Sequence, residues 1–187
     1  DRFMRAHNIK TCFNYHTYSN LLIYPWGYLS RESSDSLIYR DWVYEMTAIN
    51  RYASGTDQQT VNYSTRGNSD DYMFGDTTKP RTWAMTPEVG TTGFWPSQSE
   101  IFPLAIENLQ QKKLLAYYAG HYTGVKGSTV QGSGFFRRGQ PFSLNVTLQN
   151  KGVSTGASLN ISMTSNNPSL ASFSISPSTL TLHPFSS

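Results

Sequence analysis

The sequence predicts an α/β domain followed by a small all-β domain. Up to about residue 120, helical spacing of apolar residues alternates with short β-prone runs. Gly, Ser and Thr are then abundant in residues 121–134, and beyond residue 135 apolar and polar residues alternate with a period of two. The first spacing is typical of amphipathic helices and the second of half-buried strands. We therefore expect an α/β domain over residues 1–120, a linker over 121–134 and a β-sandwich over 135–187.

The first domain should begin with a helix, a strand and a second helix. Residues 1–8 fit the end of an amphipathic helix, and residues 10–16 form a largely apolar, strand-like run. A polar cluster at residues 33–35 is suited to cap a helix N-terminus. Four apolar residues follow it at helical spacing, namely Ile38, Trp42, Met46 and Ile49. We therefore expect a helix over residues 35–53.

A further strand and a second long helix complete this domain. The run TWAMTPEV, residues 82–89, is short and β-prone and is followed by a glycine turn. Between Ser99 and Gly120 apolar residues again recur at helical spacing, and these two residue types are common at helix ends. Because helices alternate with strands, the domain is predicted to be α/β.

The remaining residues should form antiparallel strands. Alternation over residues 142–149 and 159–164 predicts two strands, with a turn at 150–152 between them. Apolar residues near the end suggest two more strands; they are Phe173, Ile175, Leu180 and Leu182. A domain of roughly 55 residues is close to the lower limit for an independent core, so we expect a small or incomplete sandwich.

Composition excludes several classes of protein. Among 187 residues there are 15 Lys and Arg and 12 Asp and Glu, and the basic residues are scattered, so we expect no nucleic-acid partner. Cys12 is the only cysteine, so the chain can form no internal disulfide. No apolar run approaches the ~20 residues that a membrane-spanning helix needs. The composition fits a packed protein with few charges and many aromatics.

One block of sequence points to metal chemistry. Residues 14–28, NYHTYSNLLIYPWGY, place His16 at the end of the strand-like run and before a Pro/Gly turn. A neutral imidazole is a common zinc ligand, and a catalytic zinc takes three protein ligands. Position alone favours an ordinary polar histidine over a ligand.

This block resembles the sequence around the last zinc-binding histidine of the secreted zinc carboxypeptidases, the carboxypeptidase A/B family. Two further blocks follow in the family's order: TVNYSTRGNSDDYMFG at residues 60–75 and TWAMTPEVGTTGFWPSQSEI at residues 82–101. The resemblance covers residues 1–119. It implies that the first domain is the second half of the family's α/β/α mixed-sheet domain.

The resemblance implies roles for three residues. His16 would be a zinc ligand, and Glu88 would be the general base that takes a proton from water. Tyr63 would lie on a mobile loop that closes over the peptide and binds its C-terminal end. Without the resemblance, Glu88 reads as a surface glutamate and Tyr63 as one of twelve tyrosines.

Four more residues are implied to bind substrate. Asp70 would lie near the base of the specificity pocket, where an acid favours a C-terminal Lys or Arg. Thr17 and Tyr18, next to the histidine, and Phe94, near the pocket wall, would also contact the peptide. The segment between Glu88 and Phe94 departs from the pancreatic enzymes in being shorter.

The family's other two zinc ligands come from an upstream HxxE motif that does not occur here. We therefore expect a partial zinc site, with the missing N-terminal half of the domain as its structural partner and peptides as its substrate. This chain alone should be inactive, and the intact protein should be secreted or lie on a bacterial cell surface. Two alternatives stay open: a non-catalytic surface or glycan-binding module, and an amidase of the same chemistry that acts on cell-wall peptides.

Overall fold

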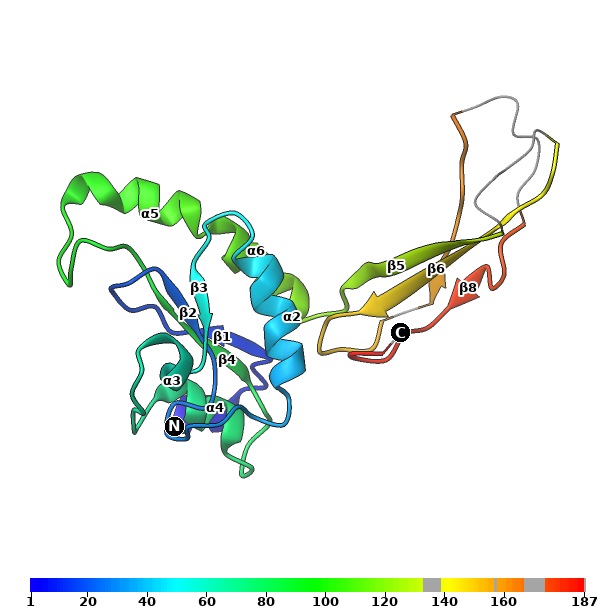
Figure 1. Ribbon diagram of the computed structural model, residues 1–187. Helices are drawn as coiled ribbons and strands as arrows, with labels where there is room; N and C mark the ends of the chain where they lie inside the picture. Colours follow the sequence, from blue (N-terminus) through cyan, green and yellow to red (C-terminus); the bar gives the residue numbers. More distant parts are fainter. Residues whose placement is uncertain (133–138, 157, 167–173, 187) are drawn as a thin grey trace. The chain divides into compact units, whose positions relative to one another are not determined.

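The computed structural model describes residues 1–132, 139–156, 158–166 and 174–186 (Figure 1). The chain divides into two compact units, residues 1–119 and residues 120–187, and each is described by itself.

A four-stranded mixed sheet forms the centre of the first unit. Its strands are β1 (Thr11–Phe13), β2 (Leu21–Ile23), β3 (Ala53–Gly55) and β4 (Trp83–Glu88). They lie in the order β1-β4-β2-β3. β1 runs parallel to β4, and β2 runs antiparallel to β4 and parallel to β3. The predicted α/β class is confirmed, and the sheet is mixed.

Helices pack around this sheet. They are α1 (Arg2–Ala6), α2 (Ser36–Met46), α3 (Asp57–Thr60), α4 (Ser69–Gly75), α5 (Ile101–Glu107) and α6 (Leu109–Tyr118), with a 3-10 turn η1 (Gln98–Glu100) before α5. α4 packs against β4, and α6 packs against both β1 and α2. Within the described residues, no helix is long and apolar enough to cross a membrane.

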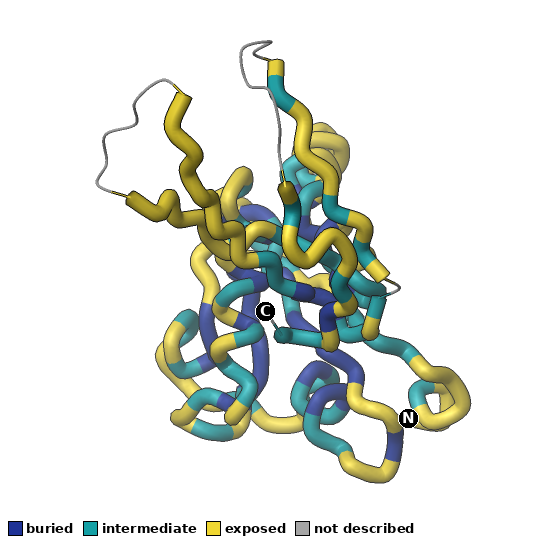
Figure 2. The backbone as a smooth tube through the Cα atoms, turned by 90° about the vertical axis from the view of Figure 1, so that its right-hand side faces the viewer, coloured by how far each residue is buried: buried dark blue, intermediate teal, exposed yellow. Residues whose placement is uncertain are grey.

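Aromatic side chains fill much of the core between α2 and the sheet. Trp42 and Tyr39 of α2 have no exposed surface. Trp42 stacks on Tyr118 of α6 with ring centroids 4.7 Å apart, and the Tyr39 hydroxyl donates a hydrogen bond to the Ala84 carbonyl of β4 (3.2 Å). Figure 2 shows buried backbone concentrated in the strands and helices of this unit. Aromatic pairs of this kind stabilise the folded state beyond the contribution of buried apolar area.

The helix predicted over residues 35–53 is shorter than expected. It ends at Met46, and the Thr47 hydroxyl donates to the Val43 carbonyl (2.8 Å), which competes with continued helical bonding. Arg51 then takes a left-handed backbone conformation (φ 60°). Ile49, expected on the buried face, is 68% exposed.

The second long helix predicted between Ser99 and Gly120 is interrupted at Asn108. The buried Asn108 amide donates to the Leu104 carbonyl (2.9 Å) and to the Tyr52 hydroxyl (3.0 Å). A side chain that bonds nearby backbone offers an alternative to continuing the helix. The result is two helices, α5 and α6, in place of one.

The second unit contains small antiparallel sheets. Its strands are β5 (Thr123–Gln131), β6 (Ser143–Asn150), β7 (Leu159–Asn160) and β8 (Thr179–Leu180). β5 pairs with β6, and β7 pairs with β8. The segment expected to be a linker, residues 121–134, therefore holds the longest strand: its Val and Thr residues pair with β6 although Gly and Ser surround them. Phe173, expected on a further strand, lies outside the described residues.

The β5–β6 ribbon is more exposed than the alternation predicts. Leu144 and Val146 of β6 are 41% and 45% exposed, as Figure 2 shows for most of the ribbon. A two-stranded ribbon has little apolar surface to bury on its own. At its end Asn150 is fully buried, and its amide bonds the backbone of four other residues, namely Tyr122, Gly152, Ser154 and Leu182.

Candidate functional site

The sheet brings His16 and Glu88 together although 72 positions separate them. The His16 amide donates to the Pro87 carbonyl (2.9 Å), and the Val89 amide donates to the His16 carbonyl (2.9 Å). These bonds form a parallel bridge between His16 and Glu88, the last residue of β4. Neighbouring strands lie about 4.8 Å apart, and directly paired residues present their side chains on the same face. An imidazole and a carboxylate therefore start from adjacent backbone positions.

The surroundings of Glu88 favour its protonated form. Partial burial raises the pKa of this carboxyl, the nearby charge of Asp57 raises it further, and His16 acts in the opposite direction. A general base is most effective when its pKa lies closer to the working pH than that of a free carboxylate. Glu88 is therefore a carboxyl group with a raised pKa that lies next to an imidazole.

A second contact orients the imidazole. The Asn14 amide nitrogen lies 3.0 Å from His16 Nε2 and donates to the Ser69 hydroxyl (2.7 Å). An amide nitrogen can only donate, so in this arrangement Nε2 accepts and the neutral ring carries its proton on Nδ1. A metal on Nδ1 would instead require a hydrogen-bond acceptor, such as the Asn14 amide oxygen, to face an Nε2–H group.

The described residues provide part of a zinc site. His16 is exposed and offers one nitrogen ligand, and a catalytic zinc takes three protein ligands. In the part of the chain that the structure describes, no group of three or more His, Cys, Asp and Glu side chains could hold a metal ion. Among the described residues, His16 is therefore a single candidate ligand and no complete zinc site is formed.

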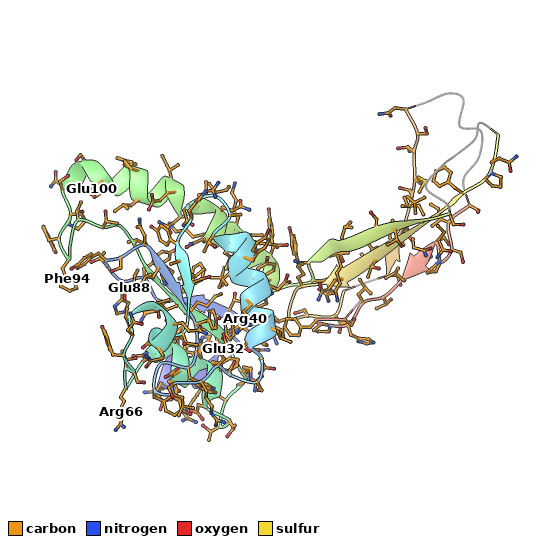
Figure 3. The ribbon with its side chains drawn as sticks, in the orientation of Figure 1. Glu32, Arg40, Arg66, Glu88, Phe94 and Glu100 are labelled. Atoms are coloured by element: carbon orange, nitrogen blue, oxygen red, sulfur yellow. The ribbon has the colours of Figure 1, made fainter. Side chains whose placement is uncertain are left out.

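Three of the predicted substrate-binding residues form an aromatic rim, defined as Thr17, Tyr18 and Phe94. The Tyr18 and Phe94 rings meet edge to face with centroids 5.3 Å apart, and the Thr17 hydroxyl donates to the Phe94 carbonyl (3.5 Å). Phe94 is 80% exposed, and Figure 3 shows it on the same side of the unit as Glu88. Apolar surface is thus exposed on the side of the unit that carries Glu88.

Tyr63 lies on the loop of residues 61–68, which connects α3 to α4. Its side chain is 60% exposed. The predicted loop is therefore shorter than residues 60–75, because α4 begins at Ser69.

Asp70 is a buried carboxyl group in the first turn of α4. It is 2% exposed, and its Oδ1 atom has no hydrogen-bond partner among the residues that the structure describes. Burial, followed by the charge of Asp71 and then that of Asp57, raises the pKa of Asp70 to about 7. A buried carboxyl without a cation is held partly protonated at neutral pH.

Asp71 faces a different part of the chain. It follows Asp70 in the first turn of α4. The Asp71 carboxylate accepts hydrogen bonds from the backbone amides of Gly27 (2.9 Å) and Tyr28 (3.2 Å). It therefore holds the turn that follows β2.

Sequence reasoning missed Asp57, which is 3% exposed and accepts hydrogen bonds from the side chains of Thr65 and Asn68. A signal for it was present. Thr56 and Gln59 form a capping box that starts α3 and places Asp57 in its first turn. The pattern of Thr followed three residues later by Gln is a known helix-start signature.

The family profile described as zinc carboxypeptidase matches residues 1–111, more than half of the chain. The chain belongs to the zinc carboxypeptidase family. Two relatives support this: carboxypeptidase B of Astacus astacus is 29% identical over 120 residues, covering 60% of this chain and 39% of that protein. The zinc carboxypeptidase of Saccharothrix mutabilis subsp. capreolus is 29% identical over 126 residues, covering 65% of this chain and 29% of that protein.

Solved structures give related matches. Bovine thrombin-activatable fibrinolysis inhibitor in complex with tick carboxypeptidase inhibitor is 29% identical, with a TM-score of 0.47 over 58% of this zinc carboxypeptidase chain and 38% of that one. A second structure of thrombin-activatable fibrinolysis inhibitor is 27% identical, with a TM-score of 0.49 over 62% of this chain and 31% of that one. The chain thus spans between 29% and 39% of the length of the proteins it matches.

Proposed function

We propose that this chain supplies one zinc ligand and the general base of a carboxypeptidase that removes C-terminal residues from peptides. The observation that supports this most is the backbone bridge between His16 and Glu88. It brings an imidazole next to a carboxyl group whose pKa is raised by burial, which supports the proposal. Family membership gives this pair its chemical context.

In this proposal His16 is the metal ligand, and Asn14 lies within hydrogen-bond distance of its ring. Zinc, when bound, polarises the scissile carbonyl and lowers the pKa of a bound water. Glu88 accepts a proton from that water and later donates it to the leaving amine. Glu88 suits both steps because burial brings its pKa closer to neutrality.

Substrate contacts come from the loop, the rim and the buried acids. Tyr63, exposed on its loop, binds the C-terminal end of the peptide, and the aromatic rim contacts residues near the scissile bond. Asp70 supports a preference for a C-terminal Lys or Arg, because Asp70 Oδ1 lacks a partner and two further aspartates raise its pKa. A substrate cation would supply the missing positive charge.

The remaining zinc ligands are proposed to come from an upstream half of the domain, because the matched proteins are more than twice as long as the matched region. The second unit would act as a β-sandwich accessory domain. We propose that the intact protein is secreted or displayed on a bacterial surface, as the bacterial relative is compatible with that setting.

The test is peptide hydrolysis by a protein that joins this chain to its upstream half. His16→Ala and Glu88→Gln should each lower kcat/KM by at least about 10³-fold, whereas His7→Ala, on the exposed surface of α1's C-terminal end, should leave it unchanged. The 187-residue chain alone should show no turnover with added zinc. Peptide or glycan binding that is unaffected by His16→Ala and Glu88→Gln, without hydrolysis, would support the binding-module alternative and overturn the proposal.

A further inference from the structure

Asp57 is a buried carboxylate whose partners all come from one loop. Its Oδ2 atom accepts hydrogen bonds from the Thr65 hydroxyl and from the Asn68 amide (3.0 Å), and the Asn68 amide also reaches the Thr65 hydroxyl. At 3% exposure this carboxylate is almost fully removed from water. Burying a charge is costly unless hydrogen bonds compensate it, so these bonds are strong constraints on the groups that make them.

The two side-chain donors lie on the segment that carries Tyr63. On one side of Tyr63, the Val61 amide donates to the Asp57 carbonyl (2.8 Å). On the other side, Thr65 bonds the Asp57 carboxylate with its hydroxyl and the Gly27 carbonyl with its amide (2.9 Å). The loop of residues 61–68 is therefore fastened on both sides of Tyr63, whose own side chain stays 60% exposed.

The contact with Gly27 depends on the absence of a side chain. A Cβ atom added at Gly27 would collide with the side chains of Asn68, Thr65 and Asp57. The Asp71 carboxylate also accepts a hydrogen bond from the Gly27 amide (2.9 Å). The turn after β2 is thus bonded by the Asp71 carboxylate and by the Thr65 amide, and the loop packs closely against it.

Asp57 also lies close enough to the proposed base to act on it. Its charge contributes to the raised pKa of Glu88. Asp57, which binds the loop, therefore also interacts electrostatically with Glu88, the proposed base.

We propose that Asp57 is a positioning residue that fastens the loop of residues 61–68 to the turn at Gly27 and so presents Tyr63 at the site. It acts through Thr65 and Asn68 and does not touch the substrate. The catalytic part of this inference rests on the proposed function, whereas the structural part can be tested without it.

The structural test is limited proteolysis of the 187-residue chain with trypsin. Arg66 is exposed on the anchored loop and projects outward, as Figure 3 shows. Loss of hydrogen bonds to a charged group should open the loop, so Asp57→Asn should speed cleavage after Arg66 by about tenfold. Thr65→Val, which removes the hydroxyl that donates to Asp57, should also speed cleavage after Arg66. Asp76→Asn, which removes an aspartate charge at the far end of α4, is the matched control and should not raise cleavage after Arg66 relative to cleavage at the other sites.

The functional test is a double-mutant cycle in the extended enzyme. Tyr63→Phe should raise KM in the wild-type background and should have little further effect in the Asp57→Asn background, because an unfastened loop no longer presents Tyr63. A purely structural role of Asp57 would leave the two effects additive.

The outcomes separate the two ideas. Unchanged cleavage after Arg66 in both Asp57→Asn and Thr65→Val, or cleavage that rises equally at all sites, would overturn the anchor. If cleavage after Arg66 is faster in the variants but the extended protein hydrolyses no peptide, Asp57 still fastens the loop and the proposed function is refuted. Faster cleavage with additive effects in the cycle would retain the fastening and overturn the presentation of Tyr63.

Discussion

Replacing Asp70 with asparagine should remove a pH dependence from the stability of the first unit. In the native state burial raises the pKa of Asp70 from its usual 3.8 to about 7, whereas in the unfolded chain the carboxyl is solvated. Between these two values the native state binds more protons than the unfolded state. Stability that is fully present below pH 3.8 is therefore lost as pH rises toward 7. Asparagine is neutral throughout and has nearly the same shape.

The size of the effect follows from the two pKa values. The interval from 3.8 to about 7, at about 1.36 kcal/mol per pKa unit, corresponds to up to about 4 kcal/mol. Wild type and Asp70→Asn should be similar in stability near pH 4, where Asp70 is protonated. At pH 8 the variant should be more stable by an amount of this order, because the wild type then carries a buried charge whose Oδ1 has no partner.

Urea unfolding followed by tryptophan fluorescence measures this directly. All four tryptophans lie within residues 1–119, so the signal reports the first unit. The control is Asp76→Asn: hydrogen bonds from Thr78 lower the pKa of Asp76, so this variant should lose stability chiefly at neutral pH. Parallel curves for wild type and Asp70→Asn between pH 4 and pH 8 would refute the reasoning.

Three further experiments test packing with five substitutions. Asn150→Ala removes an amide that makes four hydrogen bonds to backbone groups, so circular dichroism should show the second unit destabilised by about 3 kcal/mol or more. Gly27→Ala should cost the first unit about 1–3 kcal/mol in urea unfolding, because its Cβ has no room, whereas Gly127→Ala meets open space and should be nearly neutral for its unit. Ile49→Lys should change the free energy of unfolding by less than about 0.5 kcal/mol, since Ile49 is 68% exposed. Trp42→Ala in the core should lower it by about 3–5 kcal/mol. Equal losses for the two variants would contradict the end of α2 at Met46.

Local patterns predicted much of the first unit. The β-prone run before the glycine turn does form β4, and Glu88 is its last residue. The polar cluster at residues 33–35 precedes α2 as expected. These elements depend on neighbouring residues, which sequence periodicity captures. The ends were harder, because Thr47 and Asn108 interrupt helices through side-chain bonds that compete with the backbone.

The site depends on contacts that no local pattern contains. The bridge between His16 and Glu88 requires that β1 lie next to β4, and pairing between distant segments is set by the whole sheet. Asp57 was missed because its role appears only when the loop of residues 61–68 folds back onto it. In the second unit, composition suggested a linker where β5 forms, since a strand can tolerate Gly and Ser when its partner supplies the hydrogen bonds.

The central claim is that His16 binds zinc beside Glu88. Its most direct test is the zinc affinity of the protein that joins this chain to its upstream half, measured by competition with a metal-binding dye. His16→Ala should weaken zinc binding at least about 100-fold, because one of three ligands is lost, and His7→Ala should leave the affinity unchanged. Equal zinc affinity for wild type and His16→Ala would contradict the account.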